Sequence, residues 1–209
     1  MGTELEWKYA VPESSGLDEI LVWQEIQQRM LETPRHYHMQ SDYYDTPDLR
    51  FSRARITIRR RMENEVSVVC VKAPLSNASD PHLRGEWELE DGDLLHALPR
   101  LVALGAPCEI LESACLHSLW RADFLRRAVL LRLDDGSTAE LALDHGTLSG
   151  PASSVPLCEL ELELKTGKPD VARAFVAAIA AHFGLEIQPL SKFARAKALC
   201  DATPGRDAT

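Results

Sequence analysis

Acidic side chains alternate with apolar ones along several short segments of this sequence. In the segment 158–165 three glutamates alternate with leucines, and in 84–90 an arginine and three glutamates alternate in the same way. Residues two apart on a strand point to the same face, so each segment would carry a row of charges on one side. Neighbouring like charges repel by a few tenths to about 1 kcal/mol. A divalent cation held by the carboxylate oxygens would remove this repulsion.

The N-terminal segment and two basic segments extend the pattern. Glu4, Glu6 and Lys8 share one face of a predicted strand. Basic side chains take alternate positions on two further predicted strands: Arg59, Arg61 and Lys72. Carboxylates that hold a metal, beside arginines and lysines that hold phosphate oxygens, would together bind a polyphosphate. A solvated amphipathic sheet would explain any one of these strands, but it explains the repeated rows of like charge poorly.

The composition is that of an ordinary globular protein with one large domain. The chain has 209 residues, 45% hydrophobic and 26% charged, and a net charge of −9, which argues against nucleic acid as a partner. We find no apolar run long enough for a membrane span and no secretory signal, so we expect a cytoplasmic protein without a membrane partner. Five cysteines without a C-x-x-C pair predict reduced thiols.

Period-two patterning dominates and predicts more strands than helices. The strands are expected near 3–11, 36–45, 54–63, 65–74, 83–90, 123–133, 138–146 and 156–166. The helices are expected near 17–31, 93–104, 169–183 and 191–199. Two short segments are predicted turns, 43–46 and 77–81, and the tail 201–209 is predicted to be disordered.

Consecutive antiparallel strands with few helices form either a sandwich or a barrel. A sandwich requires an apolar interior, whereas the alternate faces here are charged. If these faces turn inward, they line a tunnel, and the helices cover the apolar outer face. We therefore predict an α+β fold for residues 1–200, with an eight-stranded antiparallel closed β-barrel that forms a tunnel and has flanking helices.

The same segments resemble, in order, the motifs of the CYTH superfamily, also called triphosphate tunnel metalloenzymes. The matching segments are E-x-E-x-K at 4–8, Y-Y-D-T at 43–46 with Leu49, I-R-R-R at 58–61, R-x-E-x-E at 84–88, L-D-x-G at 143–146, E-L-E-L-E-L-K at 159–165 and S-K-x-x-R at 191–195. The last one departs from the family pattern, because Ala196 replaces the usual glycine.

The resemblance implies an enzyme that hydrolyses or cyclises a small-molecule triphosphate with Mg²⁺ or Mn²⁺. The segments are most similar to those of bacterial inorganic triphosphatases, without the helical, histidine-rich domain that often follows in them. We therefore expect hydrolysis of inorganic tripolyphosphate to pyrophosphate and phosphate by a monomer or homodimer. The alternatives are a thiamine triphosphatase, a class IV adenylyl cyclase, or a non-catalytic polyphosphate-binding module.

The resemblance also implies roles for individual residues. The expected metal ligands are carboxylates: Glu4, Glu6, Glu159, Glu161, Glu163 and Asp144. The expected phosphate ligands are basic: Arg59, Arg61, Lys72, Arg84, Arg126, Lys192 and Arg195. Four residues are expected to act in catalysis: Lys8, Lys72, Glu86 and Glu88.

Several of these assignments have alternatives. Glu86, Glu88 and Asp144 could serve only in salt bridges, and Lys8 could pair with a neighbouring glutamate. The sequence leaves open which glutamates of 159–163 contact the metal, and whether position 126 or 127 carries the inward arginine.

Overall fold

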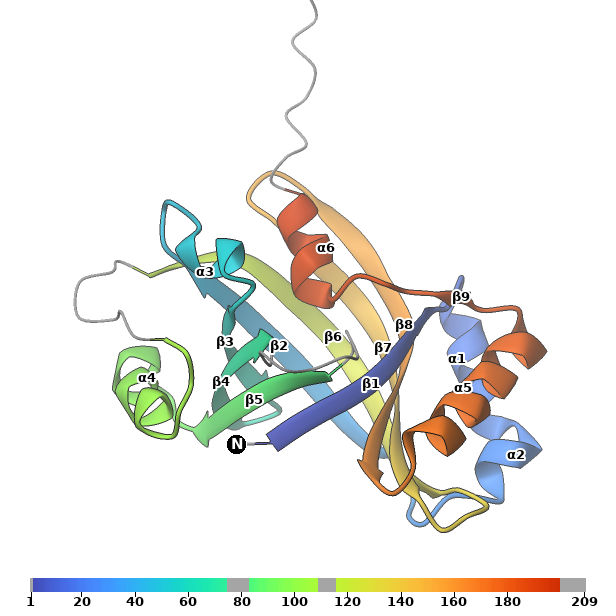
Figure 1. Ribbon diagram of the computed structural model, residues 1–209. Coiled ribbons are helices and arrows are strands. Elements are labelled where there is room, and N and C mark those ends of the chain that lie inside the picture. Colours follow the sequence, from blue (N-terminus) through green and yellow to red (C-terminus); the bar gives the residue numbers. More distant parts are fainter. Residues whose placement is uncertain (1, 75–82, 109–115, 200–209) are drawn as a thin grey trace, which may run out of the picture.

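Antiparallel strands are the main elements of the computed structural model, which describes residues 2–74, 83–108 and 116–199 (Figure 1). The strands are β1 (Gly2–Ala10), β2 (Arg35–Asp45), β3 (Thr57–Glu63), β4 (Val66–Pro74), β5 (Leu83–Glu90), β6 (His117–Arg132), β7 (Thr138–Ser149), β8 (Ser154–Thr166) and β9 (Glu186–Ile187). The helices are α1 (Ser14–Val22), α2 (Gln24–Gln27), α3 (Arg50–Arg53), α4 (Leu94–Ala103), α5 (Pro169–Phe183) and α6 (Lys192–Ala198). The predicted turn at 77–81 and the predicted disordered tail 201–209 lie outside the described residues.

Eight strands form a closed ring. Their order is β5-β4-β3-β2-β6-β7-β8-β1, and pairing of β1 with β5 completes the circle. The two-residue β9 pairs with the end of β1 beyond the stretch that contacts β5. The predicted eight-stranded closed antiparallel barrel is therefore confirmed. The sequence did not predict β9, because two residues carry no periodic signal.

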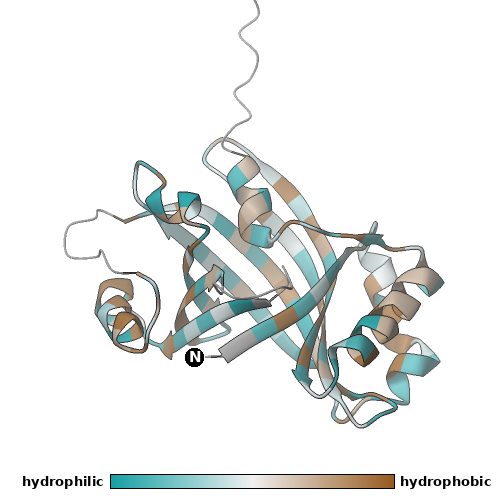
Figure 2. Ribbon diagram, viewed as in Figure 1, coloured by the Kyte–Doolittle hydropathy of each residue, from teal (hydrophilic) through white to brown (hydrophobic). Residues whose placement is uncertain are grey.

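Most side chains that point into the barrel are polar, whereas those that point outward are mainly apolar. On β8, Leu160 and Leu162 are fully buried in an outer core, whereas Glu161 and Glu163 line the interior. Figure 2 shows the same alternation of hydrophilic and hydrophobic residues along the strands. This arrangement follows from the period of two, because each strand must place its apolar set against one layer only.

Helices cover the apolar outer face on two sides (Figure 1). Helices α1, α2 and α5 pack on the β1, β6, β7 and β8 side, with Ile26 and Ile179 in the core between them. Helix α4 packs on β4 and β5 through Leu98, which is fully buried against Val71. Each such side chain contributes roughly 1.5–3 kcal/mol of burial free energy. The hydrophobic stabilisation therefore comes mainly from the apolar side chains packed between the outer face of the barrel and the helices that cover it.

Helix α6 closes one end of the barrel. The ring of Phe193 lies 5.3 Å from that of Tyr43 and 5.2 Å from that of Trp120, measured between centroids. The Ser191 hydroxyl accepts a hydrogen bond from the backbone N–H of Ala194 at 3.1 Å and so caps the helix. These contacts fix the residues of α6 that face the interior.

Three local predictions were inaccurate. The helix expected at 17–31 is two helices, α1 and α2, because Trp23 is extended between them (φ −62°, ψ 133°). The sequence did not predict α3, whose first turn is held by the buried carboxylate of Asp45 through the N–H groups of Phe51 and Ser52. Strand β6 begins at His117, before the expected position 123, because the whole of β2 pairs with residues 117–128. In the described part of the chain, no helix has the length and apolar character to cross a membrane.

Gly146 is expected to be essential for the fold, because β6 passes directly over it. A Cβ at position 146 would lie 2.2 Å from the carbonyl oxygen of Asp123 and 2.5 Å from the Cα of Phe124. We expect Gly146→Ala to lower the free energy of unfolding by about 2–3 kcal/mol or more, measured by urea denaturation. Gly92→Ala is the control, because a Cβ there has no neighbour within 4 Å among the described residues. Equal effects of the two substitutions would contradict this expectation.

Candidate functional site in the barrel interior

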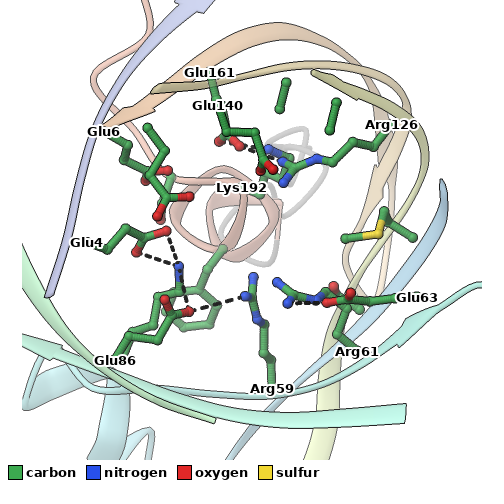
Figure 3. A pocket seen from close by; sticks show the side chains of 18 of the residues that line it. Glu4, Glu6, Arg59, Arg61, Glu63, Glu86, Arg126, Glu140, Glu161 and Lys192 are labelled. Atoms are coloured by element: carbon green, nitrogen blue, oxygen red, sulfur yellow. Dashed lines mark hydrogen bonds and ion pairs between the residues drawn. The ribbon is translucent and has the colours of Figure 1, made fainter. Parts of the chain in front are cut away.

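The barrel encloses a cavity of about 420 Å³ whose wall is mainly charged. The acidic lining residues are Glu4, Glu6, Glu63, Glu86, Glu88, Glu140, Glu161 and Glu163. The basic lining residues are Lys8, Arg35, Arg59, Arg61, Lys72, Arg84, Arg126, Lys165 and Lys192. Figure 3 shows ten of them converging from the surrounding strands and from α6. Nine basic and eight acidic groups nearly balance, so the interior as a whole is close to neutral.

Five of the eight acidic lining residues lie on β1, β7 and β8 and form an acidic row: Glu4, Glu6, Glu140, Glu161 and Glu163. The register places Glu6 opposite Glu163, and Glu163 opposite Glu140 on the next strand. Burial, together with the negative charges of nearby glutamates, raises the pKa of Glu163 above its ordinary value. Lys8 compensates one end of this row, with its Nζ 2.5 Å from Glu6 Oε1, and Lys165 lies 2.7 Å from Glu163. Three carboxylates on adjacent strands thus offer the oxygen ligands that hard divalent cations prefer.

Two arginines of β3 face this acidic row from the other side of the cavity. Arg59 lies 3.6 Å from both Glu86 and Glu88, so these ion pairs are loose, whereas Arg61 lies 3.3 Å from Glu88 and pairs closely with Glu63. The Nε–H groups of Arg59 and Arg61 are buried and have no hydrogen-bond partner among the described residues. Arg29 and Arg60 also have an orphaned Nε, but they do not line the cavity. Inside the cavity, such donors can bind an anion that enters it.

Lys72 of β4 makes ion pairs with carboxylates of two strands, β1 and β5. Its Nζ lies 2.5 Å from Glu4 Oε2 and 3.1 Å from Glu86 Oε1. Burial alone would lower the pKa of Lys72, but the carboxylates of Glu4 and Glu86 together raise the pKa above the ordinary value of 10.5, so the amine stays charged. The neighbouring thiol of Cys70 has its pKa raised to about 12 by burial. This thiol is therefore protonated at neutral pH, and it is a poor ligand for a hard cation.

A network of buried charges forms the floor of the cavity, where α6 meets the barrel. Lys192 Nζ lies 2.7 Å from Asp144 and 2.9 Å from Glu161, and it also bonds to Glu159. Arg126 donates to Asp144 at 2.7 Å and to Glu161 at 2.6 Å, while Arg195 pairs with Glu159. In this floor network three cations thus neutralise three carboxylates: Arg126, Lys192 and Arg195 with Asp144, Glu159 and Glu161.

The floor network controls the charge state of its members. Burial alone would raise the pKa of Glu161, but Lys192 and Arg126 hold it well below its ordinary value. Burial prevails at Glu159, whose pKa is raised. Glu161 is therefore a carboxylate across the neutral range, and it is the member of the network that lines the cavity from β8.

Comparison with known proteins establishes the family. The model of the CYTH domain matches residues 2–196, nearly the whole chain. The chain belongs to the CYTH family. The floor network, the acidic row and the two arginines Arg59 and Arg61 therefore lie within a CYTH domain.

One curated relative and several solved structures resemble the chain. An inorganic triphosphatase of Haemophilus influenzae is 26% identical over 167 residues, which cover 78% of this chain and 46% of the relative. The chain thus spans about half the length of that relative. A Hippeastrum protein, described as a candidate adenylyl cyclase with a dominant triphosphatase activity, matches with a TM-score of 0.63 and 16% identity, over 93% of this chain and 95% of its own. The PH1819 protein of Pyrococcus horikoshii matches with a TM-score of 0.58 and 17% identity, over 96% and 99%. At these identities the structures support the fold alone.

Most of the residues predicted from the CYTH motifs line the cavity. They are Glu4, Glu6, Lys8, Arg59, Arg61, Lys72, Arg84, Glu86, Glu88, Arg126, Glu161, Glu163 and Lys192. The inward arginine of β6 is Arg126, whereas Arg127 bonds to Asp18 of α1. Asp144, Glu159 and Arg195 belong to the floor network and do not line the cavity. The metal, phosphate or catalytic role of each residue stays a prediction.

The sequence analysis assigned no site role to four charged lining residues: Arg35, Glu63, Glu140 and Lys165. Alternation could have identified three of them. Glu63 follows Arg61 by two positions, Lys165 follows Glu163 by two, and Glu140 shares the face of Asp144. Arg35 begins β2 and pairs with Glu140 at 2.9 Å, and no sequence motif signals this contact.

Lys192→Met is expected to destabilise the protein strongly. It would leave the carboxylates of Asp144, Glu159 and Glu161 short of a positive charge in a buried site, which typically costs about 3–5 kcal/mol. Urea denaturation at pH 7 would measure the loss. The control is Lys168→Met, because the side chain of Lys168 is 76% exposed and should change stability by less than about 0.5 kcal/mol.

The contribution of Lys192 should also depend on pH. Burial would lower the pKa of Lys192, but Asp144, Glu159 and Glu161 raise it well above the ordinary 10.5. As the pH rises, the unfolded chain therefore loses this proton at a lower pH than the folded chain. The stabilisation by Lys192 is complete below about pH 10 and declines above it. A stability difference between wild type and Lys192→Met that grows above pH 10 would contradict this assignment.

Proposed function

We propose that this chain is a metal-dependent triphosphatase that hydrolyses inorganic tripolyphosphate to pyrophosphate and phosphate. The observation that carries the proposal is the pair Arg59 and Arg61, which line a cavity whose opposite wall is acidic and which each keep a buried Nε–H without a partner among the described residues. Unpaired cationic donors favour an anion, and the acidic wall favours a divalent cation beside it. A triphosphate complexed with a divalent cation satisfies both sides at once.

The charge balance of the cavity supports a substrate that arrives with its cation. A nearly neutral wall gives a free polyanion little net attraction, because each arginine is already near a glutamate. Arg59 is held at 3.6 Å from Glu86 and Glu88, so it can exchange a loose carboxylate contact for a direct bond to phosphate oxygen, and Arg61 would do so by releasing Glu63. The freed carboxylates can then face the cation.

The acidic row fits Mg²⁺ or Mn²⁺. Glu4, Glu6 and Glu161 would hold the ion, with Glu163 beside them, because carboxylate oxygens are the ligands that these ions prefer. Such an ion, when bound, neutralises phosphate charge and lowers the pKa of a bound water. Lys8 and Lys72 now pair with Glu6 and Glu4, and we propose that they turn to the substrate when the carboxylates bind the ion.

The remaining charged groups would position the triphosphate. Phosphoryl transfer depends mainly on alignment and charge neutralisation, so fixed cations are the main requirement. Arg59 and Arg61 would hold one end of the chain of phosphates, and Arg126 and Lys192 the other end, near the floor. Glu86 and Glu88 lie beside Arg59 and could orient the attacking water.

The aromatic residues of the cavity favour an inorganic substrate over an organic one. The rings of Tyr37, Tyr43 and Phe124 each already contact a cation or another ring of the protein, namely Arg35 at 5.9 Å, Phe193 at 5.3 Å and Arg126 at 5.6 Å. A thiamine or adenine ring would have to displace these contacts in order to stack. The similarity to an inorganic triphosphatase agrees with this preference. An adenylyl cyclase is the second candidate, because the Hippeastrum neighbour carries that description as well.

We also propose that the protein works in the cytoplasm. Cys70, Cys108 and Cys158 are free thiols, and burial raises the pKa of Cys108 to about 11, which keeps it protonated. Unpaired buried thiols are typical of a reducing compartment.

Product analysis separates the candidate reactions. Purified protein would be incubated with tripolyphosphate, thiamine triphosphate or ATP, each with Mg²⁺, with Mn²⁺ or with EDTA. We expect phosphate and pyrophosphate from tripolyphosphate, at a rate higher than for the two organic substrates, and no turnover in EDTA. Cyclic AMP from ATP would instead support the cyclase, and tight binding of tripolyphosphate without products would support a binding module.

Removing one carboxylate of the proposed metal site should abolish turnover. Glu6→Gln keeps the size of the side chain and removes its charge, so we expect kcat for tripolyphosphate to fall by about 100-fold or more. Glu65→Gln is the matched control, because Glu65 is exposed in the turn between β3 and β4. Unchanged turnover in Glu6→Gln would remove Glu6 from the metal site.

A further inference from the structure

Two cations of the proposed phosphate site share one aromatic ring. The Cζ atom of Arg126 lies 5.6 Å from the centroid of the Phe124 ring, and the Nζ atom of Lys192 lies 5.1 Å from it. Both distances are within the range of about 6 Å in which a cation is attracted to the face of a ring. Arg126 and Phe124 belong to β6, whereas Lys192 belongs to α6, so the ring joins the barrel wall to the helix that closes it.

The ring differs in kind from the other partners of these cations. Arg126 and Lys192 also bond to Asp144 and Glu161, whose charges neutralise theirs. A carboxylate that holds a cation weakens its attraction for phosphate, but an aromatic ring holds it without carrying a net charge. Phe124 can therefore help to fix the position of both cations without neutralising their charge any further.

The backbone sets the place of the ring. Phe124 is 4% exposed, and the register pairs it with Gly146 on one side and Met39 on the other. A Cβ at position 146 would lie 2.6 Å from the Cβ of Phe124, so the absence of a side chain at this position allows the close approach. The ring thus has little freedom to move away from the two cations.

We propose that Phe124 is a positioning residue, whose ring holds Arg126 and Lys192 in the geometry that binds the triphosphate. This inference rests on the proposed function. Phe124 itself touches no reacting atom; it acts through the two cations. Its loss should therefore weaken substrate binding more than it slows the chemical step.

Steady-state kinetics of three variants test the proposal. Phe124→Leu removes the π face and keeps an apolar side chain, so we expect KM for tripolyphosphate to rise about three- to thirty-fold while kcat stays within about threefold. Phe124→Tyr keeps the face and should keep KM within about twofold, provided that it melts like wild type. Phe175→Leu is the matched control, because Arg29 lies 5.2 Å above the Phe175 ring outside the cavity. We expect no change of KM in this control, and an unchanged KM in Phe124→Leu would overturn the proposal.

Fluorinated phenylalanines at position 124 separate the electrostatic role from packing, including the case in which Phe124→Leu does not fold. Stepwise fluorination withdraws charge from the ring face and changes its size little, so KM should rise with each added fluorine. A flat series, or a series in which only the melting temperature changes, would overturn the proposal. Calorimetric Kd values for tripolyphosphate should follow the same trend. Binding without turnover in wild type would reject the proposed hydrolysis alone, whereas absence of both would reject both inferences.

Discussion

The pairing of opposite charges inside a closed ring of strands is the interaction on which the rest of this structure depends. An isolated buried charge costs several kcal/mol, so each carboxylate in the interior requires a cation within reach. The closed barrel provides these partners, because β1 pairs with β8 along one half and with β5 along the other. Glu4 can thus reach Lys72 across β5, a contact that an open sheet would not bring about.

The charged interior also explains why the hydrophobic core is divided. The apolar faces of the strands point outward, and helices α1, α2, α4 and α5 must cover them (Figure 1). Buried ion pairs contribute little net stability, whereas the outer cores bury many large side chains such as Leu98 and Ile179. The outer cores therefore stabilise the fold, while the interior of the barrel forms the candidate binding site. The interior can keep polar groups incompletely paired, such as the Nε atoms of Arg59 and Arg61.

Helix α6 links these two parts. Its apolar residue Phe193 packs on Tyr43 and Trp120, while its neighbour Lys192 enters the floor network. One short helix therefore closes the barrel and contributes a cation to the cavity. Its position is set by both contacts together, which couples the shape of the floor to the packing of the end of the barrel.

The sequence by itself determined which side chains point inward, because alternation with a period of two assigns Glu4, Glu6, Arg59 and Glu161 to one face without any tertiary information. It did not determine how far along the tunnel each side chain lies. Glu159 and Glu161 share a face, yet Glu159 pairs in register with Asp144 in the floor and Glu161 lines the cavity. That difference arises from the stagger between strands and from the docking of α6, which depend on packing across the whole ring. The same reason hid Arg35 and β9, whose places follow from contacts distant in sequence. Helix α3 was missed because four residues are too short for a periodic signal.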